Sequence, residues 1–166
     1  FTDYEVLLYH DGPISRPLPS IAYDHSINVT PERFNDWGHS LRHKGILAAK
    51  GEYIFHLNAD NIIYPNCLEE IVNTVNKDSI FYSFTNKDLI VFAIILRGQS
   101  SNGEGVWRDK NFEDEYLILT GYPPLFSTID CMQLVMKRDI WLKEGAWDNI
   151  NENSDGIMYP YFIHKY

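Results

Sequence analysis

The chain is poor in cysteine and in basic residues. Its 166 residues include two cysteines, Cys67 and Cys131, and their wide separation lacks the spacing of metal ligands. We expect two buried free thiols, which favours a reducing compartment. Only 14 Lys and Arg stand against 23 Asp and Glu, so the formal net charge is −9 and no basic stripe is available for phosphate backbones. Nucleic acid is therefore not an expected partner.

Long apolar runs are also missing. The longest, Leu89 to Leu96, is well short of the roughly 20 residues that a transmembrane helix needs. The first residues show no basic region followed by an apolar stretch, so we expect no signal peptide. These absences predict a cytoplasmic protein without a transmembrane segment, either free or at the cytoplasmic face of a membrane.

The composition that remains is globular and rich in aromatic residues. Hydrophobic residues make up 45%, charged residues 22% and aromatic residues 14% of the chain. Chains of this length bury about two-thirds of their unfolded surface, so a single domain over residues 1–166 is expected. The aromatic side chains suit stacking surfaces or an apolar pocket, and equally a core built from rings.

The order of apolar segments predicts an α/β fold. Strands are expected at residues 4–9, 26–29, 53–57, 80–84, 89–95, 116–119 and 130–136, and helices at 37–49, after Pro65 and from about Asp155. Because strands and helices alternate in the first half, we expect a three-layer α/β/α domain around a mostly parallel sheet. Ligands bind beyond the carboxyl ends of such strands, and Asp11 and Asp60 each follow a predicted strand.

The first predicted helix carries a stripe of apolar and small residues. Trp37, Leu41, Gly45 and Ala48 follow helical spacing, which predicts that Trp37 packs in the core. Gly51 is expected to end this helix, because glycine adopts the left-handed conformation that terminates helices.

The segment Asn58-Ala59-Asp60 is a candidate metal site. An amide and a carboxylate two residues apart at a strand end can both point into a crevice, and Mg²⁺ prefers such oxygen ligands together with substrate phosphates. The alternative is an Asx turn in which Asn58 and Asp60 only cap the helix that follows. The spacing alone leaves both interpretations open.

Several segments resemble one enzyme family. Arg42 and Gly45 stand where that family has Ala-Arg-Asn-x-Gly, and residues 49–54 match Ala-x-Gly-Glu-Tyr-Ile. Residues 57–61, followed by Pro65, match a strand that ends in Asp-x-Asp, residues 4–12 match the second strand, and residues 129–138 with 145–148 match a later strand and its helix. Together they resemble the family 2 glycosyltransferases, which have the A-type nucleotide-diphospho-sugar transferase fold.

The resemblance implies a donor site. Asp60 matches the Asp that binds Mn²⁺ or Mg²⁺ against the diphosphate of a nucleotide sugar, with a UDP-sugar as the favoured donor. Asn58 stands where the first Asp of the motif usually is. Asp11 matches the Asp that contacts the nucleotide base. Arg42 matches the family's Arg, with simple pairing to a carboxylate as the alternative.

The resemblance also implies a catalytic residue. Asn153-Ser154-Asp155-Gly156 is similar to the family's late acidic motif, whose Asp is the general base of inverting members, so Asp155 is the candidate base. Capping of the last helix is the alternative role, and Asp148 is a rival candidate. The implied reaction is an inverting, hexosyltransferase-type transfer to a hydroxyl of a carbohydrate acceptor, in polysaccharide or glycoprotein glycan synthesis. Tyr122, Phe126 and Trp147 are candidates to cradle that acceptor.

Two departures from the family pattern keep a second hypothesis open. Asn58 removes one negative charge from the motif, and the family's first βα unit has no recognisable counterpart before Tyr4. We therefore also consider a catalytically inactive module of the same fold that binds nucleotide sugars or carbohydrates.

Overall fold

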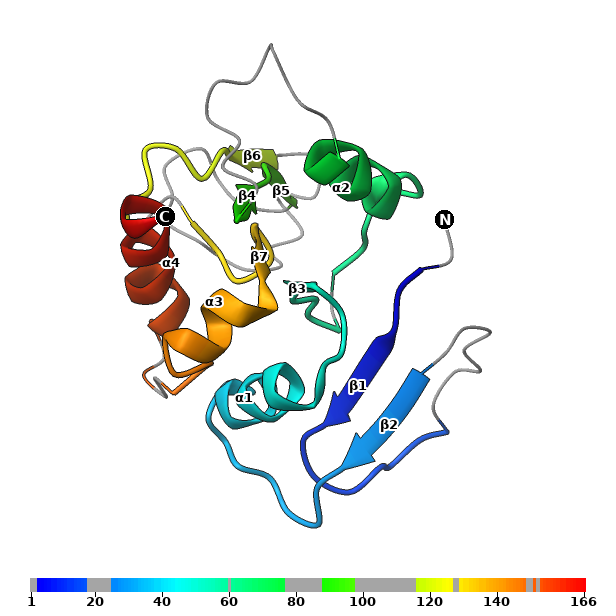
Figure 1. The fold of residues 1–166 in the computed structure, drawn as a ribbon. Coiled ribbons are helices and arrows are strands. Elements are labelled where there is room, and N and C mark those ends of the chain that lie inside the picture. Colours follow the sequence, from blue (N-terminus) through cyan, green and yellow to red (C-terminus); the bar gives the residue numbers. More distant parts are fainter. Residues whose placement is uncertain are drawn as a thin grey trace.

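The computed structural model describes residues 3–17, 25–59, 61–76, 88–97, 116–126, 129–148, 151 and 153–166. The helices are α1 (His39–Ala48), α2 (Cys67–Asn76), α3 (Arg138–Lys143) and α4 (Ser154–Lys165) (Figure 1). The strands are β1 (Val6–His10), β2 (His25–Val29), β3 (Tyr53–Phe55), β4 (Leu89–Val91), β5 (Ile94–Arg97), β6 (Tyr116–Leu119) and β7 (Leu134–Lys137). The strand predicted at residues 80–84 lies outside the described residues.

The described strands form three small sheets. β1 and β2 pair in parallel, β7 lies between β3 and β4 and is antiparallel to both, and β5 and β6 pair antiparallel. The α/β class is confirmed, but the described pairings differ from the mostly parallel sheet that we predicted. The reason is β7, which comes from late in the chain and enters the central sheet in the opposite direction to its neighbours.

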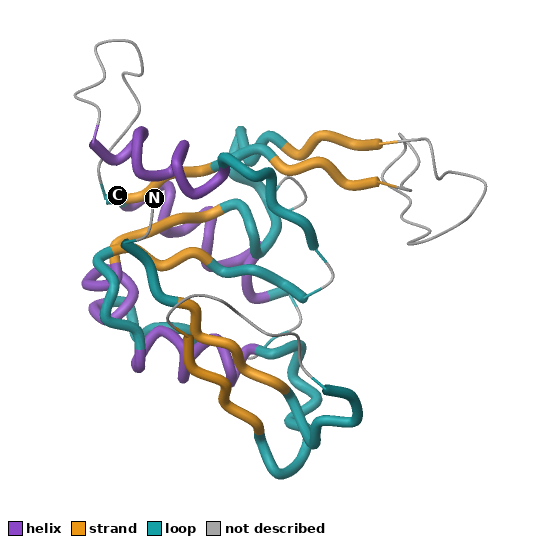
Figure 2. The backbone as a smooth tube through the Cα atoms, turned by 90° about the vertical axis from the view of Figure 1, so that its right-hand side faces the viewer, coloured by secondary structure: helices purple, strands orange, loops and turns teal. Residues whose placement is uncertain are grey.

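The predicted strand at 89–95 is divided in two. β4 pairs with β7, whereas β5 pairs with β6 in a separate ribbon, and the chain changes partner at Phe92 and Ala93. Figure 2 shows this β5–β6 ribbon extending away from the other elements. The continuous apolar run from Leu89 to Leu96 therefore contributes strands to two different sheets.

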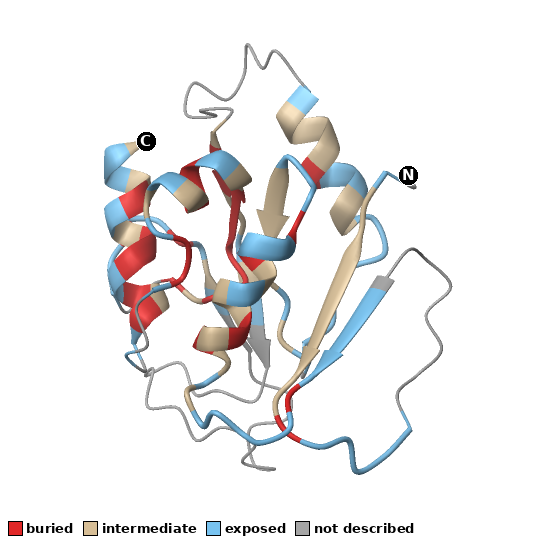
Figure 3. Cartoon of the chain, turned by 60° about the horizontal axis from the view of Figure 1, so that its bottom comes forward, coloured by how far each residue is buried: buried red, intermediate tan, exposed pale blue. Residues whose placement is uncertain are grey.

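The main core lies around β7, α3 and α4. Its largest fully buried side chains are Trp141, Trp147, Tyr159 and Phe162. The ring centroid of Trp141 lies 5.7 Å from that of Trp147 and 5.2 Å from that of Phe162. In Figure 3 the buried positions gather on the side of the molecule that holds α4, whereas β2 is exposed.

Helix α2 follows its predicted apolar stripe. Ile71 is buried, and Leu68 and Val75 pack beside it in a second cluster with Ile90 and Val135. Both cysteines are free, as predicted, although Cys131 is buried and Cys67 only half-buried. Within the described residues, none of the helices combines the length and the apolar character that crossing a bilayer requires.

The stripe predicted for the first helix is only partly correct: Leu41 is buried, but Trp37 and Ala48 are exposed. Gly38, at φ 80°, delays the start of α1 to His39, so Trp37 lies before the helix and is 63% exposed instead of packing in the core. The helix buries His39, Leu41 and Ile46. Ala48 is its last residue and Ala49 is extended at its end, so Gly51 does not terminate it.

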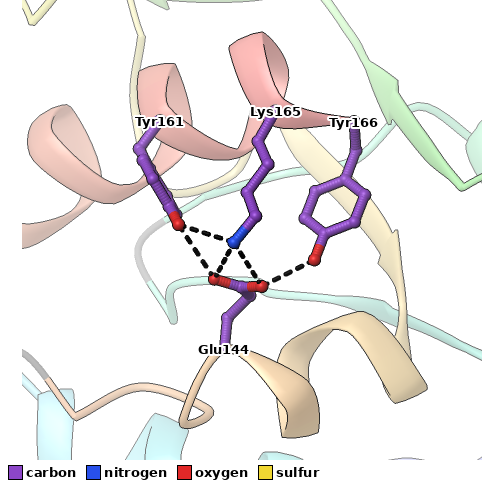
Figure 4. A network of polar contacts seen from close by, with 4 residues as sticks. All are labelled: Glu144, Tyr161, Lys165 and Tyr166. Atoms are coloured by element: carbon purple, nitrogen blue, oxygen red, sulfur yellow. Dashed lines mark hydrogen bonds and ion pairs between the residues drawn. The ribbon is translucent and has the colours of Figure 1, made fainter.

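A polar network joins the end of α3 to the end of α4. Glu144, directly after α3, accepts hydrogen bonds from Lys165 Nζ at 2.8 and 2.9 Å and from the Tyr166 hydroxyl at 2.6 Å. The Tyr161 hydroxyl also contacts this carboxylate, at 3.2 Å (Figure 4). These donors, chiefly Lys165, lower the pKa of Glu144 to about 2.

Candidate active site

A cavity of about 520 Å³ opens beside the start of α1. Its lining comes from five separate parts of the chain and consists of Trp37, His39, Arg42, Asn58, Ala59, Asp130, Cys131, Trp147 and Asp155. Four of the predicted residues therefore meet in one place: Arg42, Asn58 and Asp155, together with Trp147, which was a candidate to cradle the acceptor. Asp60 lies outside the described residues, although its neighbours Asn58 and Ala59 line the cavity.

Arg42 links two parts of the cavity wall. Its Nη2 atom donates to the side-chain oxygen of Asn58 at 2.7 Å, and its Nη1 atom donates to the carbonyl of Trp37 at 2.7 Å. The guanidinium lies 5.0 Å from the ring centroid of Trp147, a distance that allows a cation–π contact. Within the part of the chain that the structure describes, Arg42 forms no salt bridge, so simple pairing with a described carboxylate is not its role.

The side chain of Asn58 is hydrogen-bonded to Arg42. Its amide oxygen accepts from Arg42, and the Cys131 Sγ atom lies 3.8 Å from the same oxygen. The backbone carbonyl of Asn58 accepts the N–H of Asn61 at 3.2 Å in a turn. Helix α2 begins only at Cys67, so Asn58 is not at its N-cap position.

Asp155 lies in the first turn of α4, where a negative charge is favourable for the helix. The N-cap position belongs to Asn153, so Asp155 does not occupy it. The Asp155 side chain is half-buried and accepts the N–H of Gly156 at 2.8 Å.

A second carboxylate, Asp130, lines the cavity with Asp155. Burial raises the pKa of Asp130, and the negative charge of Asp155 raises it further. Gln133, which is fully buried, holds this segment: its Oε1 atom accepts the N–H of Asp130 at 2.8 Å, and its Nε2 atom donates to the carbonyls of Phe92 and Leu119. Gln133, directly before β7, thus fixes the backbone position of Asp130.

A hydrogen-bonded chain connects α1 to α4 beside the cavity. The Trp147 Nε1 atom donates to Ser154 Oγ at 3.1 Å, and both ring nitrogens of His39 lie 3.3 Å from that oxygen. Arg42 Nη1 lies 3.3 Å from His39 Nδ1. Because arginine can only donate, a hydrogen bond between these two atoms requires Nδ1 of a neutral imidazole as the acceptor. Burial, with the charge of Arg42, lowers the pKa of His39.

His56 lies against the tryptophan pair next to the site. Its ring meets Trp141 and Trp147 edge-on, with centroid distances of 5.3 and 5.1 Å. Burial, followed by the charge of Arg42, lowers its pKa to about 3. Both ring nitrogens are buried and lack hydrogen-bond partners among the described residues.

The other predicted residues lie outside the cavity lining. Asp11, at the end of β1, accepts the N–H of Phe34 at 2.9 Å and so holds the loop that leads to α1. Asp148, the rival base, is exposed. Tyr122 and Phe126 are exposed as well, although one edge of the Phe126 ring lies against Gly156, where an added Cβ would come within 2.8 Å of it.

The described residues do not form a metal site by themselves. Among them, no three His, Cys, Asp or Glu side chains converge as a metal site would require. Mg²⁺ needs only one or two protein carboxylates when substrate phosphates complete its shell. A site built on Asp60 and a diphosphate therefore fits the donor chemistry of this segment.

Comparison with known proteins identifies the family. Residues 1–141 match the model of glycosyl transferase family 2. The chain belongs to this family. It is 30% identical over 151 residues to an uncharacterized glycosyltransferase of Rickettsia prowazekii and 26% identical over 151 residues to one of Rickettsia typhi.

The match to these glycosyltransferases is partial. Each alignment covers 89% of this chain and 45% of the relative, so the chain spans less than half the length of the curated relatives it matches. Asp155 and α4 lie beyond the residues that match the family model. No solved structure matches the chain.

Trp37, Asp130 and His39 line the cavity but are not predicted as site residues from the sequence. Trp37 was assigned to the core because its spacing fits the helix stripe, and only the glycine that follows it warns of a later helix start. Asp130 was not singled out, although it shortly precedes a buried strand and lies within a segment that resembles the family. His39 carried no signal, because its role depends on contacts with α4.

Proposed function

We propose that the chain transfers a sugar from a nucleotide-diphosphate donor, a UDP-sugar, to a hydroxyl of a carbohydrate or glycan acceptor, with inversion at the anomeric carbon. Membership of glycosyl transferase family 2 supports glycosyl transfer. The observation that carries the proposal is the cavity itself, where the cation of Arg42 and the carboxylate of Asp155 line one space. Such a space can hold an anionic donor together with a nucleophile that must lose a proton.

Asp155 is the proposed general base. A hydroxyl is a weak nucleophile until a positioned carboxylate takes its proton, and this contribution is worth about 10²- to 10⁴-fold in rate. The acceptor oxygen forms its bond to the anomeric carbon as the bond from that carbon to the diphosphate oxygen breaks. The proton passes to Asp155, and the nucleoside diphosphate leaves with the electron pair.

We propose that the diphosphate of the donor binds next to Arg42 and Asp60. Arg42 presents a guanidinium to the cavity and is held there by Asn58 and by the carbonyl of Trp37. We assign Asp60 as the carboxylate that holds Mn²⁺ or Mg²⁺, because the Asn58 oxygen is already bound to Arg42. When bound, such an ion offsets the charge of the departing diphosphate. Asp11 is assigned to the nucleotide base.

The proposal is tested by a transfer assay on the full chain with a panel of UDP-, GDP- and dTDP-sugars and simple carbohydrate acceptors. We expect one donor class to give product with Mn²⁺ and little product with EDTA. Asp60→Ala is expected to lose the metal-dependent rate. Equal turnover with Mn²⁺ and with EDTA, or an undiminished rate in Asp60→Ala, would contradict the metal assignment. No turnover with any donor would contradict the transfer.

An inactive binding module is the second candidate, and the contact between Asn58 and Arg42 favours it. Asn58 supplies an amide where the motif usually has a carboxylate, and its oxygen accepts from Arg42, so one expected metal ligand is lost. This candidate predicts metal-dependent binding of UDP by calorimetry with no turnover of any nucleotide sugar. Turnover in the transfer assay would exclude it.

A further inference from the structure

Trp37 has an unusual conformation at the edge of the cavity. Its backbone has φ 55°, in the left-handed region that large side chains avoid, and its side chain is 63% exposed while lining the cavity. A bulky apolar side chain gains little from such exposure, and strained residues of this kind concentrate at ligand sites. The combination points to a ligand that covers the indole.

The surrounding contacts hold Trp37 in this conformation. The Trp37 carbonyl accepts the hydrogen bond from Arg42 Nη1 at 2.7 Å. The carboxylate of Asp36, the residue before Trp37, accepts the N–H of Gly38 at 3.1 Å and that of Ser40 at 2.9 Å. The backbone at Trp37 is therefore tied to a residue that lines the cavity and to the first turn of α1.

We infer that the indole of Trp37 is the stacking platform for the nucleobase of the donor, an inference that rests on the proposed function. Among the lining residues that the structure describes, Arg42 carries the positive charge that a diphosphate requires, and its Nη1 atom donates to the backbone carbonyl of Trp37. A nucleobase is the flat aromatic part of a nucleotide whose diphosphate lies at Arg42. An acceptor hydroxyl must instead reach the carboxylate of Asp155.

Stacking of this kind increases the affinity for nucleotides but contributes little to selectivity among nucleobases. Every base has a π-face, and removal of an aromatic platform typically weakens binding by about tenfold or more. Trp37 should therefore strengthen binding of several nucleotides to a similar degree. Groups that bond to the edge of the base would then discriminate among them.

The test is calorimetric titration of the full chain with UDP, GDP and dTDP in the presence of Mn²⁺, with pyrophosphate as the ligand that lacks a base. We expect Trp37→Ala to weaken the nucleoside diphosphate that binds best by about tenfold and to leave pyrophosphate unchanged. Trp37→Phe should keep most of the affinity. Leu47→Ala, which shortens an exposed apolar side chain on α1, is the matched control and should bind like the parent.

A fourth variant separates binding from folding. Trp37→Gly removes the ring but suits the left-handed backbone, so its melting temperature should equal or exceed that of the parent while nucleotide affinity falls. Nucleotide affinity within twofold of the parent in Trp37→Ala would overturn the inference. So would an equal loss for pyrophosphate, because Trp37 would then act through Arg42.

The outcomes also separate this inference from the proposed function. A rise in the KM of the acceptor, with unchanged nucleotide affinity, would assign the indole to the acceptor and overturn the inference alone. Continued transfer by a Trp37→Ala variant with parental nucleotide affinity would do the same. If the parent bound none of the three nucleotides, both the inference and the donor assignment would fail.

Discussion

Arg42 joins two segments of the cavity wall that are 21 residues apart in the chain. It holds the carbonyl of Trp37 on one side and the amide of Asn58 on the other, and it stacks over Trp147. A carboxylate at position 58 would pair with the guanidinium and cancel its charge. With an amide there, Arg42 keeps a charge that can attract a diphosphate.

The two carboxylates of the cavity make Asp130 sensitive to pH. Its pKa in the folded chain is raised above the ordinary 3.8, first by burial and then by Asp155. A carboxyl group whose pKa is raised on folding costs stability once it ionises, and the cost disappears as the pH falls below 3.8. Ionised Asp130 should therefore destabilise the fold at neutral pH.

We expect Asp130→Asn to raise the melting temperature at pH 7 by about 2–4 °C, which corresponds to about 1 kcal/mol in a chain of this size. The Asp130 carboxylate accepts the N–H of Met132 at 3.4 Å, and the asparagine oxygen can still do so. Thermal unfolding followed from pH 7 to pH 3.5 should show the gain shrinking as the pH falls. Asp3→Asn, at an exposed position, serves as control. A gain that does not change with pH would contradict the explanation.

At the scale of single residues, the sequence predicts which motif residues lie at the cavity better than it predicts the other residues that line it. Arg42, Asn58 and Asp155 were predicted because they lie in short segments that resemble the family's motifs, and the structure brings all three to the cavity. Trp37 was wrongly assigned because a left-handed residue is invisible to helical periodicity. Asp130 was not predicted because its raised pKa depends on burial and on a carboxylate from another segment, and both are set by the tertiary fold.

Among the elements, α4 carries Asp155, the proposed base, and is fixed at both ends. At its start, Ser154 bonds to Trp147 and contacts His39 of α1. At its end, Lys165 and Tyr166 bind Glu144, which follows α3 (Figure 4). A displacement of either end would therefore move Asp155 relative to Arg42.

The Glu144 network should make part of the stability depend on acid pH. Its pKa is lowered to about 2 from 4.5, so its contribution is present above pH 4.5 and is lost as the pH falls toward 2. We expect Glu144→Gln to melt at a lower temperature than the parent at pH 6 and at nearly the same temperature at pH 2. Melting curves by circular dichroism measure this difference. Glu32→Gln, on an exposed loop, should follow the parent at both pH values.

The elements also show what periodicity can predict. Helix α2 was predicted correctly because its stripe is strong and uninterrupted. The antiparallel insertion of β7 between β3 and β4 was not predicted, since adjacency in the sheet is set by contacts between segments that are about 80 and 45 residues apart. Local apolar patterns carry no information on strand direction.

At the scale of the whole molecule, the core and the cavity share side chains. Trp147 lines the cavity and stacks on Trp141 at the centre of the core. His56 touches both rings and lies two residues before Asn58. Changes in the charge of this histidine therefore act on the entire fold.

His56 should make the fold sensitive to moderate acid. Its pKa falls from 6.5 to about 3 on folding, so the unfolded chain binds a proton that the folded chain excludes, and stability is lost as the pH falls from 6.5 toward 3. Between pH 7 and pH 5 this amounts to about 2 kcal/mol.

Urea unfolding at the two pH values measures the loss. We expect His56→Phe to lose about 2 kcal/mol less than the parent between pH 7 and pH 5. His164→Gln, at an exposed position on α4, should behave like the parent. An identical loss in His56→Phe and the parent would show that the buried imidazole is not responsible.

The central claim is that Asp155, and not Asp148, removes the proton from the acceptor. The decisive measurement is the transfer rate of Asp155→Asn and Asp148→Asn at saturating donor, with nucleotide affinity measured in parallel. We expect Asp155→Asn to be slower by about 10²- to 10⁴-fold with unchanged nucleotide affinity, and Asp148→Asn to stay within about twofold of the parent. A parental rate in Asp155→Asn, or a collapse of the rate in Asp148→Asn, would contradict it.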